Sequence, residues 1–307
     1  MIRASAPVHV VCAGGAVADT KLQLLAAPVT GTSNPARAAS SFGGVARNVA
    51  ENLAALFRGV TGPGGPGGRV ELVSAVGDDP AGAALLQHLG ACGVGTRHVA
   101  VVPGAATAQY VAILRPDGGL TLGAAAMEIL DGVTAGAIDA AWPGDGWLFV
   151  DTNLPAAVLE HILARARDTG TPVAADAVSA PKVTRLPARL DGLALLSCTS
   201  DEARAWLARH GHDSTGIDRR LAQRLCALGA SAVLLTRGAQ GVVAADADGV
   251  QIIPAVHARP VDVTGAGDAL VGGAIAVLVD GGNLLDAARA GAQRAARTIE
   301  SRLSVLP

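Results

Sequence analysis

A glycine turn that opens an apolar helix constrains the fold of this chain more than any other stretch. Residues 262–268 read D-V-T-G-A-G-D, and the apolar run that follows, residues 269–279, has helical length and no proline. Gly265 and Gly267 allow a sharp backbone turn. The N-terminus of a helix offers free N–H groups and a partial positive charge, both of which suit a phosphate. Asp268, at the start of this helix, is therefore either a helix cap or a general base beside a bound phosphate.

Beyond residue 127, strand and helix patterns alternate. Strands are predicted at 147–150, 173–176, 193–198 and 232–236, with two short ones at 242–245 and 250–253, and helices at 155–169, 201–209, 217–228 and 284–299. This alternation implies right-handed βαβ units and a parallel sheet covered on both faces. Asp151, Asn153 and Asp176 fall at the C-terminal ends of strands, where open α/β sheets bind their ligands.

The first half of the chain adds a second glycine motif and a region without helices. A buried strand at 8–13 is followed by Asp19 in the predicted loop, and Gly43 and Gly44 precede a helix in which Asn48 offers both a donor and an acceptor. A Pro/Gly-rich connector at 59–68, a strand at 70–76 and a helix at 81–92 come next. Residues 21–41 and strands at 99–102, 108–114 and 120–125 are predicted to form a flap and a small antiparallel sheet.

Several classes of function are disfavoured by composition. The net charge of −2 gives no bulk attraction to nucleic acid or anionic membranes, and an aromatic content of 2% argues against a base-stacking platform. The longest apolar run is too short to span a bilayer. The cysteines at 12, 92, 198 and 226 form no C-x-x-C pair, so their spacing indicates neither a zinc site nor a disulfide framework. We expect a cytoplasmic protein with no nucleic-acid polymer or membrane as partner.

Two common nucleotide-binding motifs are also excluded. No G-x-x-x-x-G-K-[ST] string occurs. The G-x-G-x-x-G string within residues 62–67 is interrupted by prolines and precedes a strand, and the turn at 265–267 lacks a third glycine because Leu270 stands there. An anion hole beside Asp268 is the better explanation, since phosphoryl transfer needs positioning, charge neutralisation and a base.

Together, the two glycine motifs resemble the signatures of the PfkB (ribokinase-like) family of carbohydrate and nucleoside kinases. The family's D-T-x-G-A-G-D is matched at 262–268, with Val263 as the one departure, and its G-G-x-x-x-N-x-A is matched at 43–50. The resemblance implies one α/β domain over residues 1–307, with a ribokinase-like three-layer fold. A mainly parallel sheet would have helices on both faces, and a small β-sheet lid would come from about residues 16–42 and 99–126.

The resemblance also implies an ATP-dependent kinase with named site residues. Asp268 would deprotonate the acceptor hydroxyl, beside the N–H groups of Gly265, Ala266 and Gly267. The residues that would bind the substrate are Asp19, Gly43, Gly44, Asn48 and Asn153. Those that would bind the nucleotide are Thr236, Gly238 and Gly241.

Metal sites and an assembly follow from the same resemblance. The family's N-x-x-E motif, which organises Mg²⁺ through water, reads T-S-D-E here, so Glu202 is in place while Thr199 replaces the asparagine and would contribute weakly. Potassium is implied at Asp262 and Thr264, and a homodimer through the lid.

Within the family, pseudouridine kinases are the nearest resemblance. It rests on residues 43–53 and 107–110, on Asn153 where ribokinases tend to carry Glu, and on D-A-V-S-A-P-K at 176–182; residues 125–127 depart from it. The leading hypothesis is phosphorylation of the 5′-type primary hydroxyl of a ribosyl compound, with pseudouridine first. The alternatives are a ribokinase-like sugar kinase, another nucleoside kinase and, in a different class, a sugar- or nucleotide-binding protein whose catalysis is impaired by Thr199.

Overall fold

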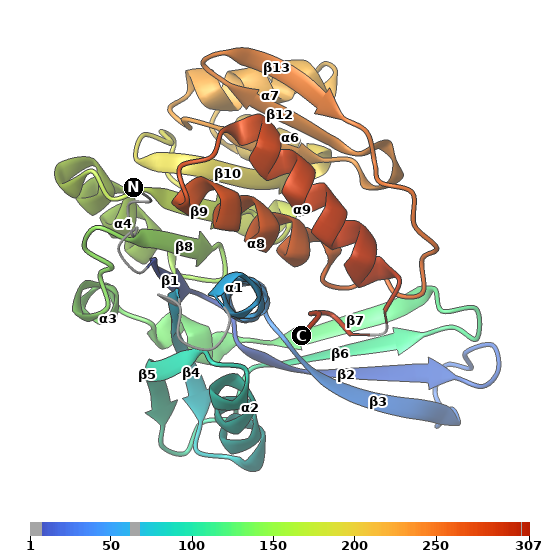
Figure 1. The fold of residues 1–307 in the computed structure, drawn as a ribbon. Coiled ribbons are helices and arrows are strands. Elements are labelled where there is room, and N and C mark those ends of the chain that lie inside the picture. Colours follow the sequence, from blue (N-terminus) through green and yellow to red (C-terminus); the bar gives the residue numbers. More distant parts are fainter. Residues whose placement is uncertain (1–7, 62–67, 302) are drawn as a thin grey trace.

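A large twisted sheet forms the centre of the molecule. The computed structural model describes residues 8–61, 68–301 and 303–307, in which nine strands pair in the order β13-β12-β11-β10-β9-β8-β1-β4-β5. The strands from β5 to β11 are parallel, and β12 and β13 add antiparallel strands at one edge (Figure 1). Their bounds are His9–Ala13 (β1), Arg69–Gly77 (β4), Gly95–Val102 (β5), Trp147–Asp151 (β8), Val173–Asp176 (β9), Leu193–Thr199 (β10), Val233–Thr236 (β11), Val242–Asp246 (β12) and Gly249–Ile253 (β13).

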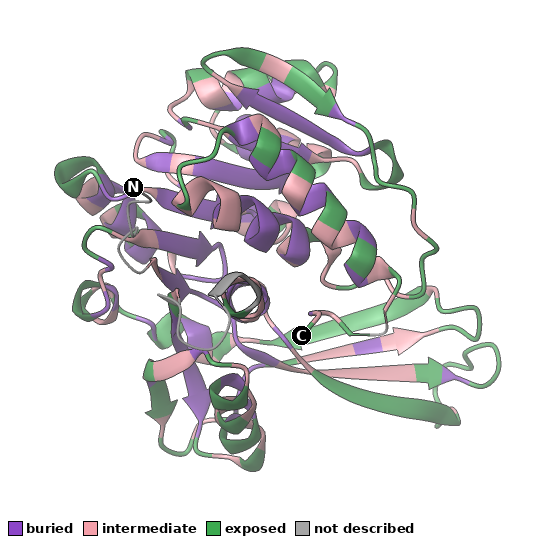
Figure 2. Cartoon of the chain, in the orientation of Figure 1, coloured by how far each residue is buried: buried purple, intermediate pink, exposed green. Residues whose placement is uncertain are grey.

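Helices cover both faces of this sheet, as predicted. One apolar core packs α4, α6 and α7 against the sheet, and a second packs α1, α2, α8 and α9 against the opposite face. Figure 2 shows the buried residues concentrated along the strands and the sheet-facing sides of the helices. The α-helices are Val45–Thr61 (α1), Pro80–Ala91 (α2), Ala135–Ala140 (α3), Ala156–Thr169 (α4), Ala180–Val183 (α5), Ser200–Arg209 (α6), Asp218–Ala227 (α7), Ala266–Val279 (α8) and Leu284–Ile299 (α9).

Helix α8 lies between α1 and α9 and is apolar on every side, as expected of a buried helix. Its glycines permit this close packing. A Cβ on Gly273 would lie 3.0 Å from the Cα of Gly291 on α9, and one on Gly272 would lie 2.8 Å from the Cβ of Asn52 on α1. The small residues of α8 therefore fix where its N-terminus lies.

A separate sheet projects from the body as a lid (Figure 1). Its strands are β2 (Val17–Leu24), β3 (Ala36–Gly43), β6 (Gln109–Leu114) and β7 (Leu120–Ala126), in the order β3-β2-β6-β7. Strands β2 and β6 pair in parallel, so the sheet is mixed rather than antiparallel.

Three boundary predictions were wrong. Strand β5 pairs with β4 in the large sheet, because β4, α2 and β5 form a βαβ unit, so the lid's second part begins at Gln109 and not at residue 99. Asp19 lies within the lid strand β2 instead of a loop. Helix α1 continues to Thr61 through the start of the predicted connector, and residues 62–67, with their glycine string, lie outside the described residues. Among the described helices, none has the length and apolar character needed to cross a membrane.

Candidate active site

The N-terminus of α8 stands at the centre of the candidate site. Its N-cap, Gly265, has φ of 80°, and a Cβ there would lie 2.2 Å from the carbonyl oxygen of Ser304, so only glycine fits. Ala266 and Gly267 form the first turn, whose N–H groups have no partners within the helix, although that of Ala266 donates to the Val263 carbonyl oxygen in the preceding turn (3.3 Å). The turn thus has the backbone geometry of an anion-binding site.

Asp268 is not the cap of this helix. The N-cap makes no side-chain hydrogen bond, and the Asp268 Oδ2 instead accepts a hydrogen bond of 2.5 Å from the Asn48 amide of α1. Burial raises the pKa of Asp268 to about 6, although the nearby Arg47 guanidinium acts in the opposite direction. The carboxyl group therefore has the pKa of a general base that works near neutral pH.

The first signature brings Asp19 and Asn48 to the same side of this turn. A Cβ on Gly43 would lie 2.0 Å from the Asp19 Oδ2, and one on Gly44, where φ is 94°, would lie 2.3 Å from the Gly15 carbonyl oxygen. Both glycines thus let the backbone approach closely. Burial raises the pKa of Asp19 to about 6, against the opposing charges of Arg47 and Lys21.

Arg47 is a site residue that was not predicted. It is 2% exposed, and its guanidinium donates to the carbonyl oxygens of Gly43 (3.1 Å) and Phe42 (2.7 Å) and to the side chains of Asn48 and Glu51. It therefore fixes the backbone before the signature and the orientation of the Asn48 amide. The one feature of the sequence that could have indicated its role is its position in the first signature, between the second glycine and the asparagine.

Asp151, at the end of β8, joins the loop after β1 to the first signature. Its carboxylate accepts backbone hydrogen bonds from Gly15 (2.9 Å), Ala46 (2.8 Å) and Asn153 (2.9 Å), and it is fully buried. It thereby ties the loop after β1 to the start of α1. Its role is to position the site rather than to react.

Asn153, the next predicted residue, is buried and accepts a hydrogen bond from Lys182. The same ammonium lies 3.3 Å from the sulfur of Met127, directly after the lid strand β7. Burial lowers the pKa of Lys182. Lys182 is a second site residue that was not predicted, although it ends the D-A-V-S-A-P-K segment at 176–182, which resembles pseudouridine kinases.

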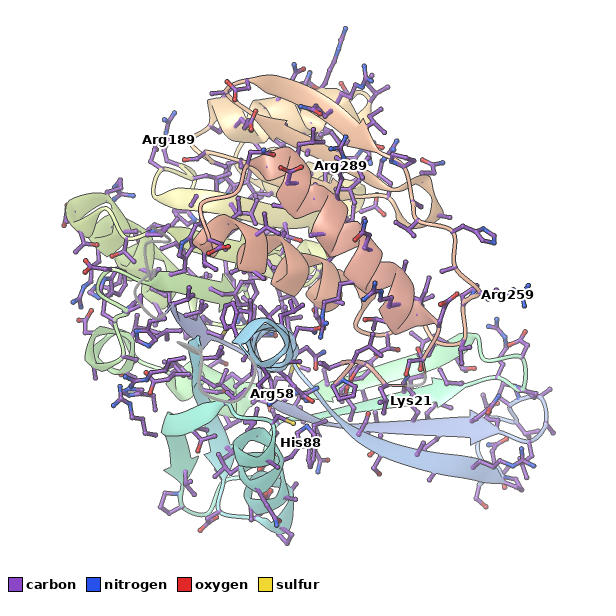
Figure 3. All side chains as sticks on the ribbon, viewed as in Figure 1. Lys21, Arg58, His88, Arg189, Arg259 and Arg289 are labelled. Carbon is purple, nitrogen blue, oxygen red and sulfur yellow. The ribbon has the colours of Figure 1, made fainter. Side chains whose placement is uncertain are left out.

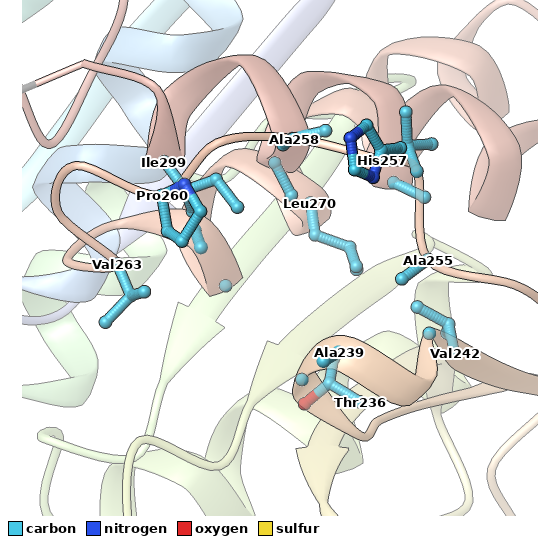
Figure 4. A pocket seen from close by; sticks show the side chains of 18 residues that line it. Thr236, Ala239, Val242, Ala255, His257, Ala258, Pro260, Val263, Leu270 and Ile299 are labelled. Atoms are coloured by element: carbon cyan, nitrogen blue, oxygen red, sulfur yellow. The ribbon is translucent and has the colours of Figure 1, made fainter.

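On the other side of the α8 turn lies a cavity of about 650 Å³ (Figure 4). The three predicted nucleotide-binding residues line it together with part of the glycine turn: Thr236, Gly238, Gly241, Ala266 and Gly267. Its remaining walls are mostly apolar and include His257, Leu270 and Ile299. The cavity suits a flat, largely apolar group whose anionic end reaches the helix N-terminus.

Thr199 and Glu202 form a capping box at the start of α6. The Thr199 hydroxyl accepts from the Glu202 N–H (3.3 Å), and a Glu202 carboxylate oxygen accepts from the Thr199 N–H (2.7 Å). Threonine is thus a strong N-cap here. The capping role leaves the second carboxylate oxygen of Glu202 available for other contacts.

The acidic residues around this position fit a hydrated Mg²⁺ ion. Burial and the charge of Asp268 raise the pKa of Asp176 to about 8, and Glu202 adds to that repulsion. In the described part of the chain these three carboxylates are not close enough to ligate one ion as a set. Mg²⁺ usually keeps several waters and binds phosphates, so Glu202 and Asp176 would hold it through water beside a nucleotide.

The predicted potassium ligands already have a cationic partner. The Lys21 ammonium, from the lid strand β2, lies 2.7 Å from the Asp262 carboxylate and 3.0 Å from the Thr264 hydroxyl. Partial burial acts to raise the pKa of Asp262, but hydrogen bonds from Lys21 and from Thr264, whose N–H donates to the carboxylate (2.9 Å), lower it overall. In this arrangement the two side chains do not fit an additional K⁺ ion.

Comparisons with known proteins identify a family and several similar structures. The model of the family described as "pfkB family carbohydrate kinase" matches residues 9–307. The pseudouridine kinase of Escherichia coli K12 is 30% identical over 257 residues, which cover 81% of this chain and 77% of that one. A carbohydrate kinase from Agrobacterium tumefaciens is 30% identical with a TM-score of 0.79, covering 97% and 92% of the two chains. A ribokinase from Arabidopsis thaliana, solved with ribose and ATP, has 21% identity and a TM-score of 0.77, covering 97% and 94%.

Proposed function

The chain belongs to the pfkB carbohydrate kinase family and is a phosphotransferase, and we propose that it moves the γ-phosphoryl group of ATP to the 5′-type primary hydroxyl of pseudouridine. The observation that carries this proposal is the 2.5 Å contact between Asn48 and Asp268, which joins the two signatures across 220 residues. Asp268, whose pKa is raised by burial to about 6, would act as the general base between the acceptor and a nucleotide bound in the apolar cavity.

In the proposed reaction, Asp268 takes the proton of the acceptor hydroxyl. The hydroxyl oxygen forms a bond to the γ-phosphorus while the bond from that phosphorus to the oxygen of ADP breaks. The N–H groups at Gly265, Ala266 and Gly267 stabilise the charge on the transferring group. Mg²⁺, held through Glu202 and water, would neutralise phosphate charge. Thr236, Gly238 and Gly241 would bind the nucleotide.

The choice of a nucleoside acceptor rests on Asn153 and Lys182. Asp19, Gly43, Gly44 and Asn48 would bind the ribosyl hydroxyls, which leaves the Lys182 ammonium and the Asn153 amide for the polar edge of a base. The carbonyl oxygens of a nucleobase can accept hydrogen bonds from the Lys182 ammonium and from the Asn153 amide. The similarity to a pseudouridine kinase supports the same choice.

The decisive experiment measures ADP release with ATP and Mg²⁺ for pseudouridine, uridine, inosine, ribose and fructose. We expect the highest kcat/KM for pseudouridine, and Lys182→Met should lower it for nucleosides more than for ribose. A higher kcat/KM for ribose would assign a sugar kinase instead. Thermal stabilisation by these compounds without any ADP release would assign a binding protein.

The pH dependence tests the base. As the pH falls through about 6, kcat/KM is expected to fall, because a protonated Asp268 cannot accept a proton. Asp19 also has its pKa raised to about 6, so the acid limb should be steeper than the about tenfold per pH unit of a single group. In Asp19→Asn the slope should return to that of one group. A profile that stays flat well below the pKa of Asp268 would contradict its role.

The position of Lys21 leads to a prediction of how the enzyme responds to potassium. Exchanging K⁺ for tetramethylammonium should change wild-type kcat little, because the Lys21 ammonium already lies on Asp262 and Thr264. Lys21→Ala should become dependent on K⁺, since it leaves those oxygens without a cation. Arg37→Ala, which removes an exposed cation from the neighbouring lid strand, is the control. Equal K⁺ dependence in wild type and Lys21→Ala would contradict this explanation.

A homodimer through the lid stays a prediction. The edge strand β7 is exposed along its length, and Leu120 and Leu122 leave apolar surface there.

A further inference from the structure

A glutamate, a histidine and a cysteine meet where α1 and α2 pack together. Histidine, cysteine, aspartate and glutamate can all bind metal ions. In the part of the chain that the structure describes, one group of three such side chains has its ligand atoms within 4.8 Å of one another: Glu51, His88 and Cys92. Figure 3 labels Arg58 of α1 and His88 of α2, and Arg58 donates to the Cys92 carbonyl oxygen. None of the three residues has a part in the proposed phosphoryl transfer.

Helix geometry explains why the three side chains meet. His88 and Cys92 are four residues apart at the C-terminal end of α2, so their side chains lie on one face. Glu51 lies on α1, one turn after Arg47. A histidine and a cysteine at this spacing form a chelating pair, and a carboxylate from a second helix adds a third donor.

The distances match those between the ligands of a single metal ion. The His88 Nε2 lies 3.1 Å from a Glu51 carboxylate oxygen and 3.5 Å from the Cys92 sulfur, and that sulfur lies 3.4 Å from the other Glu51 oxygen. Tetrahedral Zn²⁺, with bonds of about 2.3 Å to sulfur and about 2.0–2.1 Å to nitrogen or oxygen, separates its ligands by roughly 3.3–3.6 Å. Only small rotations of the side chains are needed to place an ion between them.

A fourth coordination position can be filled from solvent. A cavity of about 320 Å³ is lined by Glu51 and His88, together with residues of the lid and the C-terminal segment. A water molecule in this cavity could complete a tetrahedral set of ligands. All three protein ligands are half-buried, which limits competition from water without closing the site.

We propose that Glu51, His88 and Cys92 form a binding site for a divalent transition-metal ion of the Zn²⁺ type. Nitrogen, sulfur and a single carboxylate oxygen favour such an ion over Mg²⁺, which prefers oxygen ligands only. Without metal, burial and the Glu51 charge raise the pKa of the Cys92 thiol to about 11, so binding of the ion releases the thiol proton. No motif in the sequence indicates this site, because its ligands come from two helices and include one cysteine.

The site is connected to the candidate active site through Arg47. Glu51 pairs with Arg47, Arg47 donates to Asn48, and Asn48 donates to Asp268. A metal ion on Glu51 competes with the Arg47 guanidinium for the same carboxylate. Bound Zn²⁺ is therefore expected to loosen Arg47 and raise the KM for the acceptor, a consequence that rests on the proposed function.

The test titrates the chelator-treated full chain with Co²⁺ alone, without nucleotide or Mg²⁺. We expect one equivalent to bind with a cobalt–thiolate charge-transfer band, which Zn²⁺ then abolishes. Cys92→Ser should lose the band and bind Zn²⁺ at least about 10–100-fold more weakly, since even changes around metal ligands have effects of that size. Cys226→Ser, a half-buried cysteine outside the site, should keep both properties. His88→Ala gives a second loss of ligand if the serine variant does not fold.

Failure of this proposal is separate from failure of the proposed function. No stoichiometric cobalt binding, or a band that survives in Cys92→Ser, would overturn the metal site whatever the enzyme phosphorylates. Binding that leaves the acceptor KM unchanged would keep the metal site and remove only its connection to Arg47. A Zn²⁺ effect on KM that is equally large in Cys92→Ser would place the inhibitory ion elsewhere.

Discussion

Asp268→Asn is expected to lower kcat by about 10²–10⁴-fold, the usual effect of removing a general base. The asparagine keeps the size of the side chain and can still accept the hydrogen bond that Asn48 donates. It cannot take a proton from the acceptor hydroxyl. The loss should therefore appear in kcat, while the KM for ATP stays close to that of the wild type.

Stability and the pH profile separate a lost base from a damaged site. Burial of Asp268 raises its pKa, so the native state does not depend on its charge, and Asp268→Asn should unfold at the same temperature as the wild type or higher. The acid limb assigned to Asp268 should disappear from the residual activity. Asp280→Asn, at the exposed C-terminal end of the same helix, should have normal kinetics. Near-normal kcat in Asp268→Asn would exclude it as the base.

Much of the fold could be predicted because periodicity and glycine positions carry it. The strands that end at Asp151 and Asp176 are short apolar runs, and the parallel order that alternation implies brings their C-terminal ends to one edge. The glycines at 44 and 265 have positive φ and no room for a Cβ. Their positions in the two signatures therefore indicate where the backbone needs glycine. The two signatures meet at the hydrogen bond that Asn48 donates to Asp268.

Side-chain contacts between distant elements could not be predicted in the same way. Whether Lys21 lies on Asp262 depends on how the lid is placed against the body, and its sequence neighbours give no sign of it. No helix separates the strand at Gly95–Val102 from the lid strands that follow it, and only its pairing with β4 assigns it to the large sheet. Glu202 was predicted as a metal residue, and its capping role depends on the helix that begins beside it.

Arg47→Met is expected to cause the largest loss of stability of the variants considered, roughly 3–5 kcal/mol in the free energy of unfolding, because it leaves buried partners unpaired. Arg47 is 2% exposed, and methionine fills a similar volume without donating to the carbonyl oxygens of Phe42 and Gly43 or to Glu51. Arg47→Lys should recover little, since one ammonium cannot reproduce a planar fork of donors.

The same substitution should alter catalysis through charge. The Arg47 guanidinium lowers the pKa of both Asp19 and Asp268, so its removal should raise both pKa values and move the acid limb of kcat/KM to higher pH. Urea unfolding with an unchanged m-value gives the stability change, and the pH profile is measured at a temperature where the variant is folded.

Arg189→Met, which breaks an exposed ion pair with Asp191, is the matched control and should change neither property. Because Arg47→Met removes the guanidinium that is paired with the Glu51 carboxylate, the double variant with Glu51→Gln should be more stable than Arg47→Met alone. Strictly additive losses in that double variant would show that Arg47 and Glu51 do not stabilise each other in the folded protein.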